Sequence, residues 1–498
     1  MSILVGVDCG TQGTKVIIVD TSTACVLAEC SSAHKLISES NGCREQDPQW
    51  WIDAFISAYT QALHKAHIDA KEIDAIGISG QQHGLVVLDA NAQVIRNAKL
   101  WCDTETATEN AELLTLIGGE KTAIDKLGLR IETGYTASKI LWLKKYEPEN
   151  FKKIAHILLP HDYLNYWLTG QFSTDYGDAS GTGLFDIHHR CWNREVCALI
   201  DPSGQLFDSL PKLNQAQDSA GIVVGKVKKL LGLRDDVLVS SGGGDNMMGA
   251  IGTGNVKNGI VTMSLGTSGT IYTFSDTPLA SQHPSIANFC SSSNGWLPLI
   301  CTMNVTSATT LVQQLLEVDL CEFNRLLSTS HIGANNISFL PFFNGERVPA
   351  LPHGQGSLHG LNVSNFNRSN LVRSVVEGAT YGLRYGLDLF RDAGIKVDHI
   401  RLIGGGAKSA PWRQIIADTM NAEVICPKNS EAGALGAAIQ AYWVLIGAVD
   451  HQIIDDLVSL DEDSRTVPIA SNVSLNNVAY HRYLETLYTQ YPELVEEK

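Results

Sequence analysis

The chain has 498 residues, 44% of them hydrophobic and 18% charged, a composition typical of a well-packed globular protein with two large or three ordinary domains. Its formal net charge of −16 argues against a nucleic-acid-binding or anionic-membrane surface, because either would need a basic patch. No apolar run reaches membrane-spanning length, the N-terminus lacks the basic region of a signal peptide, and the 11 cysteines form no C-x-x-C pair, so we expect reduced thiols and a cytoplasmic protein.

The first predicted element is a β-hairpin over Leu4–Asp20, in which a turn rich in glycine and threonine joins two apolar strands. Glycines in such a turn let main-chain N–H groups point at an anion, and the threonines add hydroxyl donors. Asp8 stands at the end of the first strand, where a carboxylate can hold Mg²⁺ directly or through water. Alone, the stretch is equally typical of an ordinary hairpin with a glycine turn. Its candidate phosphate-binding residues are Gly10, Thr11, Thr14 and Lys15.

Two further predicted strand ends deliver polar side chains. One buried strand ends just before Gln82 and His83, and another ends at Trp101, with Asp103 two residues later. Because ligands of an α/β sheet bind at the carboxyl ends of its strands, we expect these four residues to face a ligand. A lone histidine is more often a structural residue than a functional one, but the place of His83 at a strand end, between Gln82 and Gly84, favours the two roles equally.

The segment SSGGGDN at 240–246 follows the buried strand VLVS. Its three glycines allow the backbone to pass close to a ligand, and Asp245 is then presented at the strand end. Asp245 is the best candidate for a general base, a role that contributes about 10²–10⁴-fold to a rate. The alternative is that Asp245 caps the helix that begins at Asn246, and the two roles are compatible.

The hairpin motif occurs a second time at Met263–Asp276, with the sequence MSLGTSGTIYTFSD. Gly10, Thr11, Gly13 and Thr14 recur there as Gly266, Thr267, Gly269 and Thr270. Such a repeat indicates two related halves that together hold one nucleotide. Ser264 replaces Asp8 in the second copy, so only the first offers a carboxylate for a metal ion. The candidate phosphate-binding residues of the second copy are Gly266, Thr267 and Ser268.

A strand, a glycine-rich turn and a helix are predicted in succession from residue 400 to residue 420. The start of a helix after such a turn is a suitable place for a phosphate or ribose group, although glycines also occur at helix entries for steric reasons alone. The residues expected to line the nucleoside end of the site are Gly404, Gly405, Gly406, Ala407 and Lys408.

The last part of the chain predicts three elements. Residues 431–438 form a small-residue helix, which suits either close backbone packing or access for an adenine ring. Residues 461–466 are charged and predict an exposed linker, and an amphipathic helix containing Tyr480 and Leu487 follows. We therefore divide the chain into an N-terminal domain on the sugar and metal side (1–252), a C-terminal domain on the nucleotide side (253–460) and a linker with a helix docked on the body (461–498).

Taken together, these features resemble the actin/hexokinase/Hsp70 nucleotide-binding architecture, and the chain is similar to the FGGY family of carbohydrate kinases over essentially its whole length. The motifs that carry the resemblance are VDCGTQGTK at 7–15, YTASKILWL at 135–143, GGGDN at 242–246, SLGTSGT at 264–270, NGERVP at 344–349 and LIGGGAKSAPWRQIIADTMNAEV at 402–424. The second and the last look like the two family signatures. The resemblance implies an α/β fold of two duplicated, ribonuclease H-like domains with a cleft between them.

The resemblance also implies a reaction. GISGQQHG at 78–84, LLPHDYL at 158–164 and GGGDN look most similar to the xylulokinase subgroup of the family. This implies ATP-dependent phosphorylation of a ketopentose, D-xylulose in the first place, with Mg²⁺ as cofactor. By the same resemblance Asp245 is the proton acceptor and Asp8 the aspartate on the metal side. The implied sugar-binding residues are Gln82, His83, Trp101, Asp103, Asp245 and Asn246.

Two positions depart from the common pattern of that subgroup. Glu105 stands where the subgroup commonly carries arginine, and Gln82 where it often carries methionine. Both changes lie on the predicted sugar side and leave the predicted phosphoryl-transfer residues unchanged.

Other functions remain open from the sequence. One is an FGGY kinase for another polyol or sugar, such as L-ribulose, glycerol, L-fuculose or gluconate. The other is a non-catalytic ATP-driven switch of the Hsp70 or actin type. The expected partners are a small sugar and ATP, without nucleic acid or membrane. The sequence leaves the oligomeric state open, with a homodimer as one possibility because members of the family are often dimers.

Overall fold

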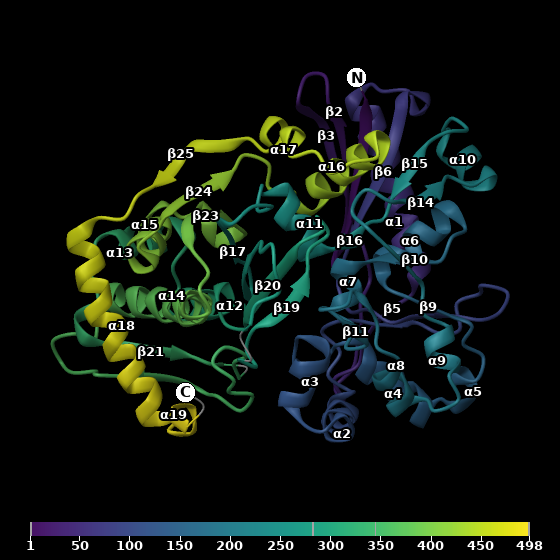
Figure 1. Cartoon of the computed structure of the whole chain (residues 1–498). Helices are drawn as coiled ribbons and strands as arrows, with labels where there is room; N and C mark the ends of the chain where they lie inside the picture. The colour runs from purple at the N-terminus through teal and green to yellow at the C-terminus, as the bar shows by residue number, and fades with distance from the viewer. Residues whose placement is uncertain (1, 281–282, 344, 497–498) are drawn as a thin grey trace. The chain divides into compact units, whose positions relative to one another are not determined.

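The computed structural model describes residues 2–280, 283–343 and 345–496, and the chain separates into two compact units (Figure 1). The first comprises Met1–Val256, Phe274–Pro298 and Glu431–Ser459, and the second comprises Lys257–Thr273, Leu299–Ser430 and Leu460–Lys498. The division of the chain at residues 252 and 460 stays a prediction. Asn344 of the NGERVP motif lies outside the described residues. Within the described part of the chain, no helix is long and apolar enough to cross a bilayer.

The first unit is built on a mixed sheet with the strand order β14-β15-β6-β1-β2-β3, and β16 also pairs with β6. The strands are β1 (Ile3–Cys9), β2 (Gly13–Asp20), β3 (Cys25–Ala33), β6 (Ile73–Gly80), β14 (Ser219–Ile222), β15 (Leu238–Ser240) and β16 (Gly243–Gly244). Strands β15 and β1 both run parallel to β6, whereas β2, β3 and β14 are antiparallel to their neighbours. The predicted first hairpin is the pair β1–β2.

The second sheet has the strand order β19-β20-β18-β17-β23-β24-β25. The strands are β17 (Gly259–Leu265), β18 (Gly269–Thr273), β19 (Ala287–Cys290), β20 (Trp296–Thr302), β23 (Val397–Ile403), β24 (Glu423–Pro427) and β25 (Leu460–Thr466). The run β20-β18-β17-β23-β24 repeats the order and the directions of β3-β2-β1-β6-β15. The duplication predicted from the two hairpins is therefore confirmed.

The two hairpin turns are not identical. In the first, the four residues Gly10–Gly13 lie between the paired residues Cys9 and Thr14. In the second, the three residues Gly266–Ser268 lie between the paired residues Leu265 and Gly269. The register of the first hairpin is thus shifted by one residue relative to its repeat, although the turn sequences match.

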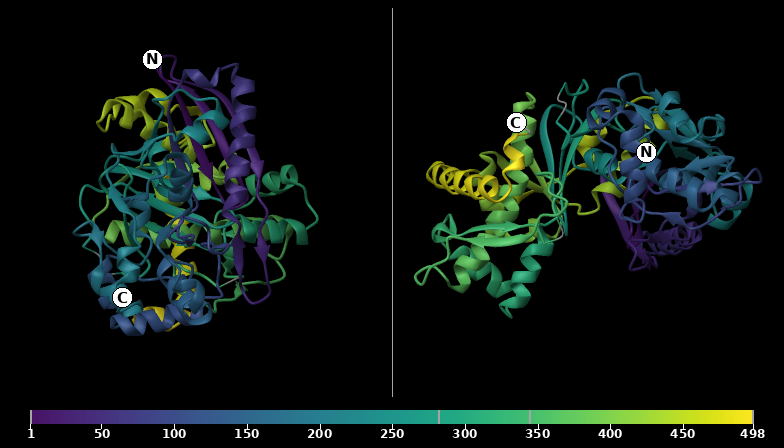
Figure 2. Two further views of the ribbon diagram at one scale, coloured as in Figure 1. Left: turned by 90° about the vertical axis from the view of Figure 1, so that its right-hand side faces the viewer. Right: turned by 90° about the horizontal axis from the view of Figure 1, so that it is seen from below.

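The strands of the first sheet send alternate side chains to two hydrophobic cores. Val5 and Val7 of β1 pack in one core with Trp51 of α1 (Pro48–Ala66), which runs along the sheet strands (Figure 2). Leu4 packs in the other core with Trp443 of α16 (Ala432–Ile446). Each fully buried apolar side chain of this kind stabilises the fold by roughly 1.5–3 kcal/mol.

Helix α16 approaches the sheet so closely that glycine is required on the strands. An ideal Cβ on Gly6 of β1 would lie 2.0 Å from the carbonyl oxygen of Ala434, and one on Gly77 of β6 would lie 1.9 Å from that of Ala437. The same helix packs on α11 (Asp245–Gly252). The small residues of 431–438 therefore serve close backbone packing, one of the two roles expected of them.

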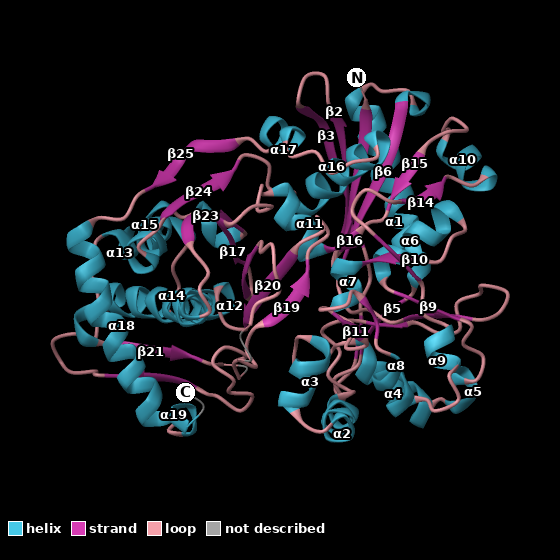
Figure 3. Cartoon of the chain, in the orientation of Figure 1, coloured by secondary structure: helices cyan, strands magenta, loops and turns pink. Residues whose placement is uncertain are grey.

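Apart from the last two helices, which follow the final strand β25, the other helices occupy the connections between strands (Figure 3). Those of eight or more residues are α2 (Ala107–Ile117), α3 (Glu120–Leu127), α4 (Thr136–Tyr146), α6 (Pro160–Thr169), α12 (Thr306–Leu315), α13 (Leu320–Ser328), α14 (Arg368–Asp392), α15 (Ala410–Met420) and α18 (Ala470–Gln490). As predicted, Tyr480 and Leu487 of α18 are buried. The segment predicted as a linker is instead the edge strand β25, which pairs antiparallel with β24. Charged side chains are common on edge strands because they discourage further pairing, so charge alone did not exclude a strand.

Candidate active site

Three neighbouring strands of the first sheet end at one edge. Asp8 of β1 pairs with Ser79 of β6, and Ser79 pairs with Gly243 of β16. Soon after these residues the strands end: β1 enters the first turn, β6 leads to Gln82, and β16 leads to Asp245. Ligands of α/β sheets bind beyond the carboxyl ends of the strands, so this edge is the candidate active site.

Asp8 is half-buried and held in place by its neighbours. Ser79 Oγ donates a hydrogen bond of 2.7 Å to Asp8 Oδ1, and burial raises the pKa of Asp8 above its ordinary value. An ideal Cβ on Gly433 would lie 3.0 Å from Asp8 Oδ1, so the site leaves little room for a side chain there. Lys15, a predicted nucleotide ligand, instead forms an ion pair of 2.5 Å with Glu431.

Asp245 is the first residue of α11. Its Oδ1 accepts hydrogen bonds from the main-chain N–H of Asn246 at 2.8 Å and from Asn246 Nδ2 at 3.1 Å. Asn246 Nδ2 also donates to Gln82 Oε1 at 2.9 Å. Three of the predicted sugar-side residues therefore form one hydrogen-bonded cluster. The alternative role of Asp245 as a helix cap is not observed, since Gly244 is the N-cap and no side chain caps α11.

The surroundings of Asp245 raise its proton affinity. Burial raises the pKa of Asp245 to about 7, and the negative charges of Asp8 and Asp178 add to the effect. A carboxylate with a pKa near neutrality is well suited to accept a proton from an alcohol. Asp178 lies in the short helix α7 (Tyr176–Ser180), where its Oδ2 is 2.8 Å from His161 Nδ1. Sequence reasoning missed this residue, and the only signal was its place in a polar, glycine-rich loop.

His83 is held in an unusual backbone conformation, with φ at 63° in the left-handed region that non-glycine residues rarely adopt. Its carbonyl oxygen accepts hydrogen bonds from Thr136 Oγ1 at 3.1 Å and Lys139 Nζ at 2.7 Å. Its ring stacks on Tyr135 with a centroid distance of 4.3 Å. Burial lowers the pKa of Lys139 to about 7. These three contacts come from the YTASKILWL motif, whose role at the site sequence reasoning did not predict.

Asp103 lies beneath the predicted sugar side, and its role as a sugar ligand stays a prediction. The side chain is fully buried, and its Oδ2 accepts hydrogen bonds from the main-chain N–H of Arg44 at 2.8 Å and from Lys99 Nζ at 3.2 Å. Buried Lys99 needs such carboxylate partners. Trp101, two residues earlier, is half-buried, and its indole N–H donates to Thr11 Oγ1 at 2.9 Å.

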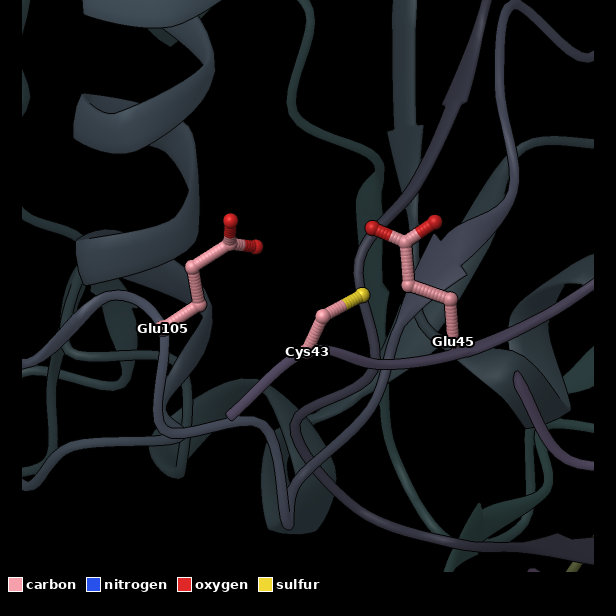
Figure 4. Close-up of side chains that lie close together, drawn as sticks. All are labelled: Cys43, Glu45 and Glu105. Atoms are coloured by element: carbon pink, nitrogen blue, oxygen red, sulfur yellow. The ribbon is translucent and has the colours of Figure 1, made fainter. Parts of the chain in front are cut away.

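Lys99 also explains a cluster that looks like a metal site. Figure 4 shows Cys43, Glu45 and Glu105 close together, with potential ligand atoms within 4.8 Å of one another. Lys99 Nζ forms an ion pair of 3.2 Å with Glu45 and another with Glu105, and lies 4.1 Å from the ring centroid of Trp142. Burial raises the pKa of Cys43 to about 11, so its thiol is protonated at neutral pH. Lys99, together with Arg96, which pairs with Glu45 at 2.6 Å, supplies the positive charge for these acids, and we assign the cluster a structural role.

Several polar groups in and beside the first turn form hydrogen bonds within the protein. The N–H of Gly10 donates to the carbonyl of Gly13 at 3.0 Å and closes the turn. Thr14 is fully buried, and its hydroxyl is hydrogen-bonded with His34 Nε2 at 2.8 Å. The Thr11 hydroxyl also has partners within the protein. The Gly10 N–H and the two threonine hydroxyls are thus hydrogen-bonded within the protein, and their predicted contact with an anion stays a prediction.

In the second unit, the two predicted nucleotide segments lie together. Strands β17 and β23 are parallel, with Ser264 opposite Ile403, so the turns that follow them are neighbours. An ideal Cβ on Gly404, whose φ is 89°, would lie 2.7 Å from the carbonyl carbon of Leu265, so only glycine fits there. The exposed or half-buried predicted residues of these turns are Gly266, Thr267, Ser268, Gly404, Gly405 and Lys408, whereas Gly406 and Ala407 are buried.

Comparison with known proteins decides the family. A model of the N-terminal domain of the FGGY family of carbohydrate kinases matches residues 3–252, and a model of the C-terminal domain matches residues 261–445. The chain belongs to the FGGY family of carbohydrate kinases. It is accordingly an ATP-dependent sugar kinase with the actin- and hexokinase-like α/β fold that its motifs predicted.

Proteins similar to this FGGY kinase include several sugar kinases. It is 52% identical over 491 residues to the xylulose kinase of Haemophilus influenzae, covering 98% of this chain and 100% of that protein. The crystal structure of xylulose kinase from Bifidobacterium adolescentis is similar with a TM-score of 0.84 and 29% identity, over 97% and 99% of the two chains. Gluconate kinase from Lactobacillus acidophilus is similar with a TM-score of 0.90 and 25% identity, over 97% of each chain.

Proposed function

We propose that this FGGY kinase transfers the γ-phosphoryl group of ATP to a primary hydroxyl of D-xylulose, giving D-xylulose 5-phosphate and ADP. The observation that carries the chemistry is the cluster of Asp245, Asn246 and Gln82, in which burial raises the pKa of Asp245 to about 7. The xylulose kinase from Haemophilus influenzae, at 52% identity, favours a ketopentose as substrate.

In the proposed reaction Asp245 is the general base. It accepts the proton of the sugar hydroxyl while the oxygen–phosphorus bond forms and the bond between the γ-phosphorus and the ADP oxygen breaks. The amides of Gln82 and Asn246 and the ring of His83 orient the sugar, and Trp101 contacts it. Phosphoryl transfer depends mainly on such positioning and on charge stabilisation.

Asp8 fits the Mg²⁺ ion that family membership implies. It is a half-buried carboxylate fixed by Ser79, and its charge adds to that of Asp245, so a hard dication would relieve an unfavourable accumulation of negative charge. When bound, Mg²⁺ neutralises charge on the phosphates during transfer. We propose that the nucleotide is held by Gly266, Thr267, Ser268, Gly404, Gly405, Gly406, Ala407 and Lys408, and on the first turn by main-chain groups other than the N–H of Gly10.

The proposed base predicts a pH dependence. Asp245 must be ionised to accept a proton, and its pKa is raised from 3.8 to about 7, so kcat/KM for the sugar should rise with pH through this region and level off above it. Bound Mg²⁺ would shift the midpoint downward, because it favours the carboxylate. A pH–rate profile measures this midpoint. A rate that is flat down to the ordinary pKa of an aspartate would contradict the assignment.

Sugar-dependent ADP release tests the proposed function against a non-catalytic ATP switch. With purified protein, ATP and Mg²⁺, we expect D-xylulose to stimulate ADP release strongly and to yield an equal amount of sugar phosphate. ADP release that no sugar stimulates would favour the switch.

A further inference from the structure

A chain of hydrogen bonds links two tryptophans of the first unit through the first turn. Trp101 Nε1 donates to Thr11 Oγ1 at 2.9 Å, and Thr11 Oγ1 donates to Gln81 Oε1 at 2.9 Å. Gln81 Nε2 donates to Gln46 Oε1 at 3.0 Å, and Trp51 Nε1 donates to the same oxygen at 2.9 Å. Gln46, Gln81 and Trp51 are essentially inaccessible to solvent. The five side chains come from four separate segments of the chain, since Gln46 and Trp51 are only five residues apart.

The direction of every bond in this chain is fixed by chemistry. The indole N–H of Trp51 can only donate, so it must meet the oxygen of the Gln46 amide. Gln46 Nε2 accordingly donates to two carbonyl oxygens, those of Thr11 and Lys35, each at 2.8 Å. Gln46 Oε1 then needs a donor from Gln81, which leaves Gln81 Oε1 to accept the Thr11 hydroxyl hydrogen. Trp101, at the other end, can again only donate.

This direction decides what the Thr11 hydroxyl can do. A hydroxyl has one hydrogen, and that of Thr11 is given to Gln81. The Thr11 side chain therefore has no hydrogen to donate to a phosphate oxygen. The remaining role of Thr11 is to position its neighbours, because Gln46 holds the Thr11 carbonyl and Trp101 donates a hydrogen bond to the Thr11 hydroxyl.

We infer that Thr11 is a positioning residue that couples Trp101 on the sugar side to the conformation of the first turn, Gly10–Gly13. Gln46 and Gln81 are the buried support of this coupling. The inference rests on the proposed function for the statements that Trp101 contacts the sugar and that the first turn contacts the nucleotide. Because one hydrogen bond joins the indole to the turn, a substitution at Trp101 or at Thr11 should weaken the binding of both the sugar and the nucleotide.

A double-variant experiment on the intact protein tests the coupling. Thr11→Val removes the hydroxyl and Trp101→Phe removes the indole N–H. We expect each variant to raise KM for ATP by about tenfold, the cost of leaving a hydrogen-bonding group of the network unpaired. Thr11→Val also removes the bond to Gln81, so the double variant should be about as weak as Thr11→Val alone and not weaker by the product of the two effects, because both changes remove the Trp101–Thr11 bond. Thr11→Ser, which keeps the hydroxyl, should restore most of the affinity.

Two controls separate the coupling from folding and from the proposed function. Thr60→Val, on the exposed face of α1, is the matched threonine change and should leave KM for ATP unchanged. If Thr11→Val does not fold, Trp101→Phe alone decides, since only the coupling predicts that it weakens nucleotide binding. ADP affinity measured by calorimetry without sugar gives the same comparison, so the coupling is tested even if no sugar is phosphorylated.

The inference is overturned if Trp101→Phe leaves nucleotide affinity unchanged while Thr11→Val weakens it. It is equally overturned if the two effects multiply, or if Thr11→Ser is no better than Thr11→Val. Each of these results would mean that Thr11 contacts the nucleotide directly or acts independently of Trp101.

Discussion

Replacing Asp245 with asparagine is expected to lower kcat for sugar phosphorylation by about 10²–10⁴-fold, the contribution typical of a general base. Asparagine has nearly the same shape and can still accept the hydrogen bond that Asn246 donates to Oδ1, but it cannot take up the sugar proton. Affinity for ATP, measured by calorimetry, should stay close to that of the wild type. A coupled assay of ADP release with saturating sugar measures the loss of rate.

The same variant should be more thermally stable than the wild type above pH 7. Burial raises the pKa of Asp245 from 3.8 to about 7 in the folded state, so the free energy of unfolding of the wild type falls as the pH rises through this range and stays lowered above it. The amide of the variant has no charge to bury at any of these pH values. Asp53→Asn, on the exposed face of α1, is the matched control and should change neither rate nor stability. A rate for Asp245→Asn within a few-fold of the wild type would contradict the assignment of the base.

Replacing Lys99 with methionine is expected to have the largest effect on stability. The ammonium group is fully buried and forms ion pairs with Glu45, Asp103 and Glu105. Removing it leaves Asp103, which is fully buried, and Glu105 without their ion-pair partner, whereas Glu45 keeps an ion pair of 2.6 Å with Arg96. Loss of one partner from a buried ionic cluster typically lowers the free energy of unfolding by about 3–5 kcal/mol. The fall in the midpoint of urea unfolding measures the effect.

Lys126→Met provides the matched comparison. Lys126 pairs with Glu195 at 2.7 Å, but the two side chains are 37% and 79% exposed. An exposed pair of this kind contributes only about 0–1 kcal/mol, so the urea midpoint should hardly move. If Lys99→Met and Lys126→Met lowered the urea midpoint equally, the structural role assigned to the Lys99 cluster would be contradicted.

The duplicated sheets and the cluster at the strand ends were predicted correctly, because local sequence patterns indicate both. The repeated turn letters of the two hairpins indicated a duplicated fold, because such a match is improbable by chance, and the two sheets do repeat their order and directions. The strand ends placed Gln82, Asp245 and Asn246 correctly in one cluster, because the carboxyl ends of parallel strands meet at one edge.

The features that were not predicted depend on partners far away in the sequence. Lys15 faces Glu431, and Thr14 faces His34, and neither partner has a local signature. Glu105, which departs from the common subgroup pattern, forms an ion pair with buried Lys99. Its side chain therefore serves the internal charge cluster, so the departure at this position carries less weight against a ketopentose substrate than the sequence alone indicated.

The measurement that tests the proposed function most directly is a comparison of sugars with the purified protein at fixed ATP and Mg²⁺. We expect D-xylulose to give the highest kcat/KM among D-xylulose, L-ribulose, glycerol, L-fuculose and gluconate, with phosphate attached to a primary hydroxyl, as phosphorus NMR of the product can show. A kcat/KM for D-xylulose no higher than that for one of the other four compounds would contradict the assignment of the substrate.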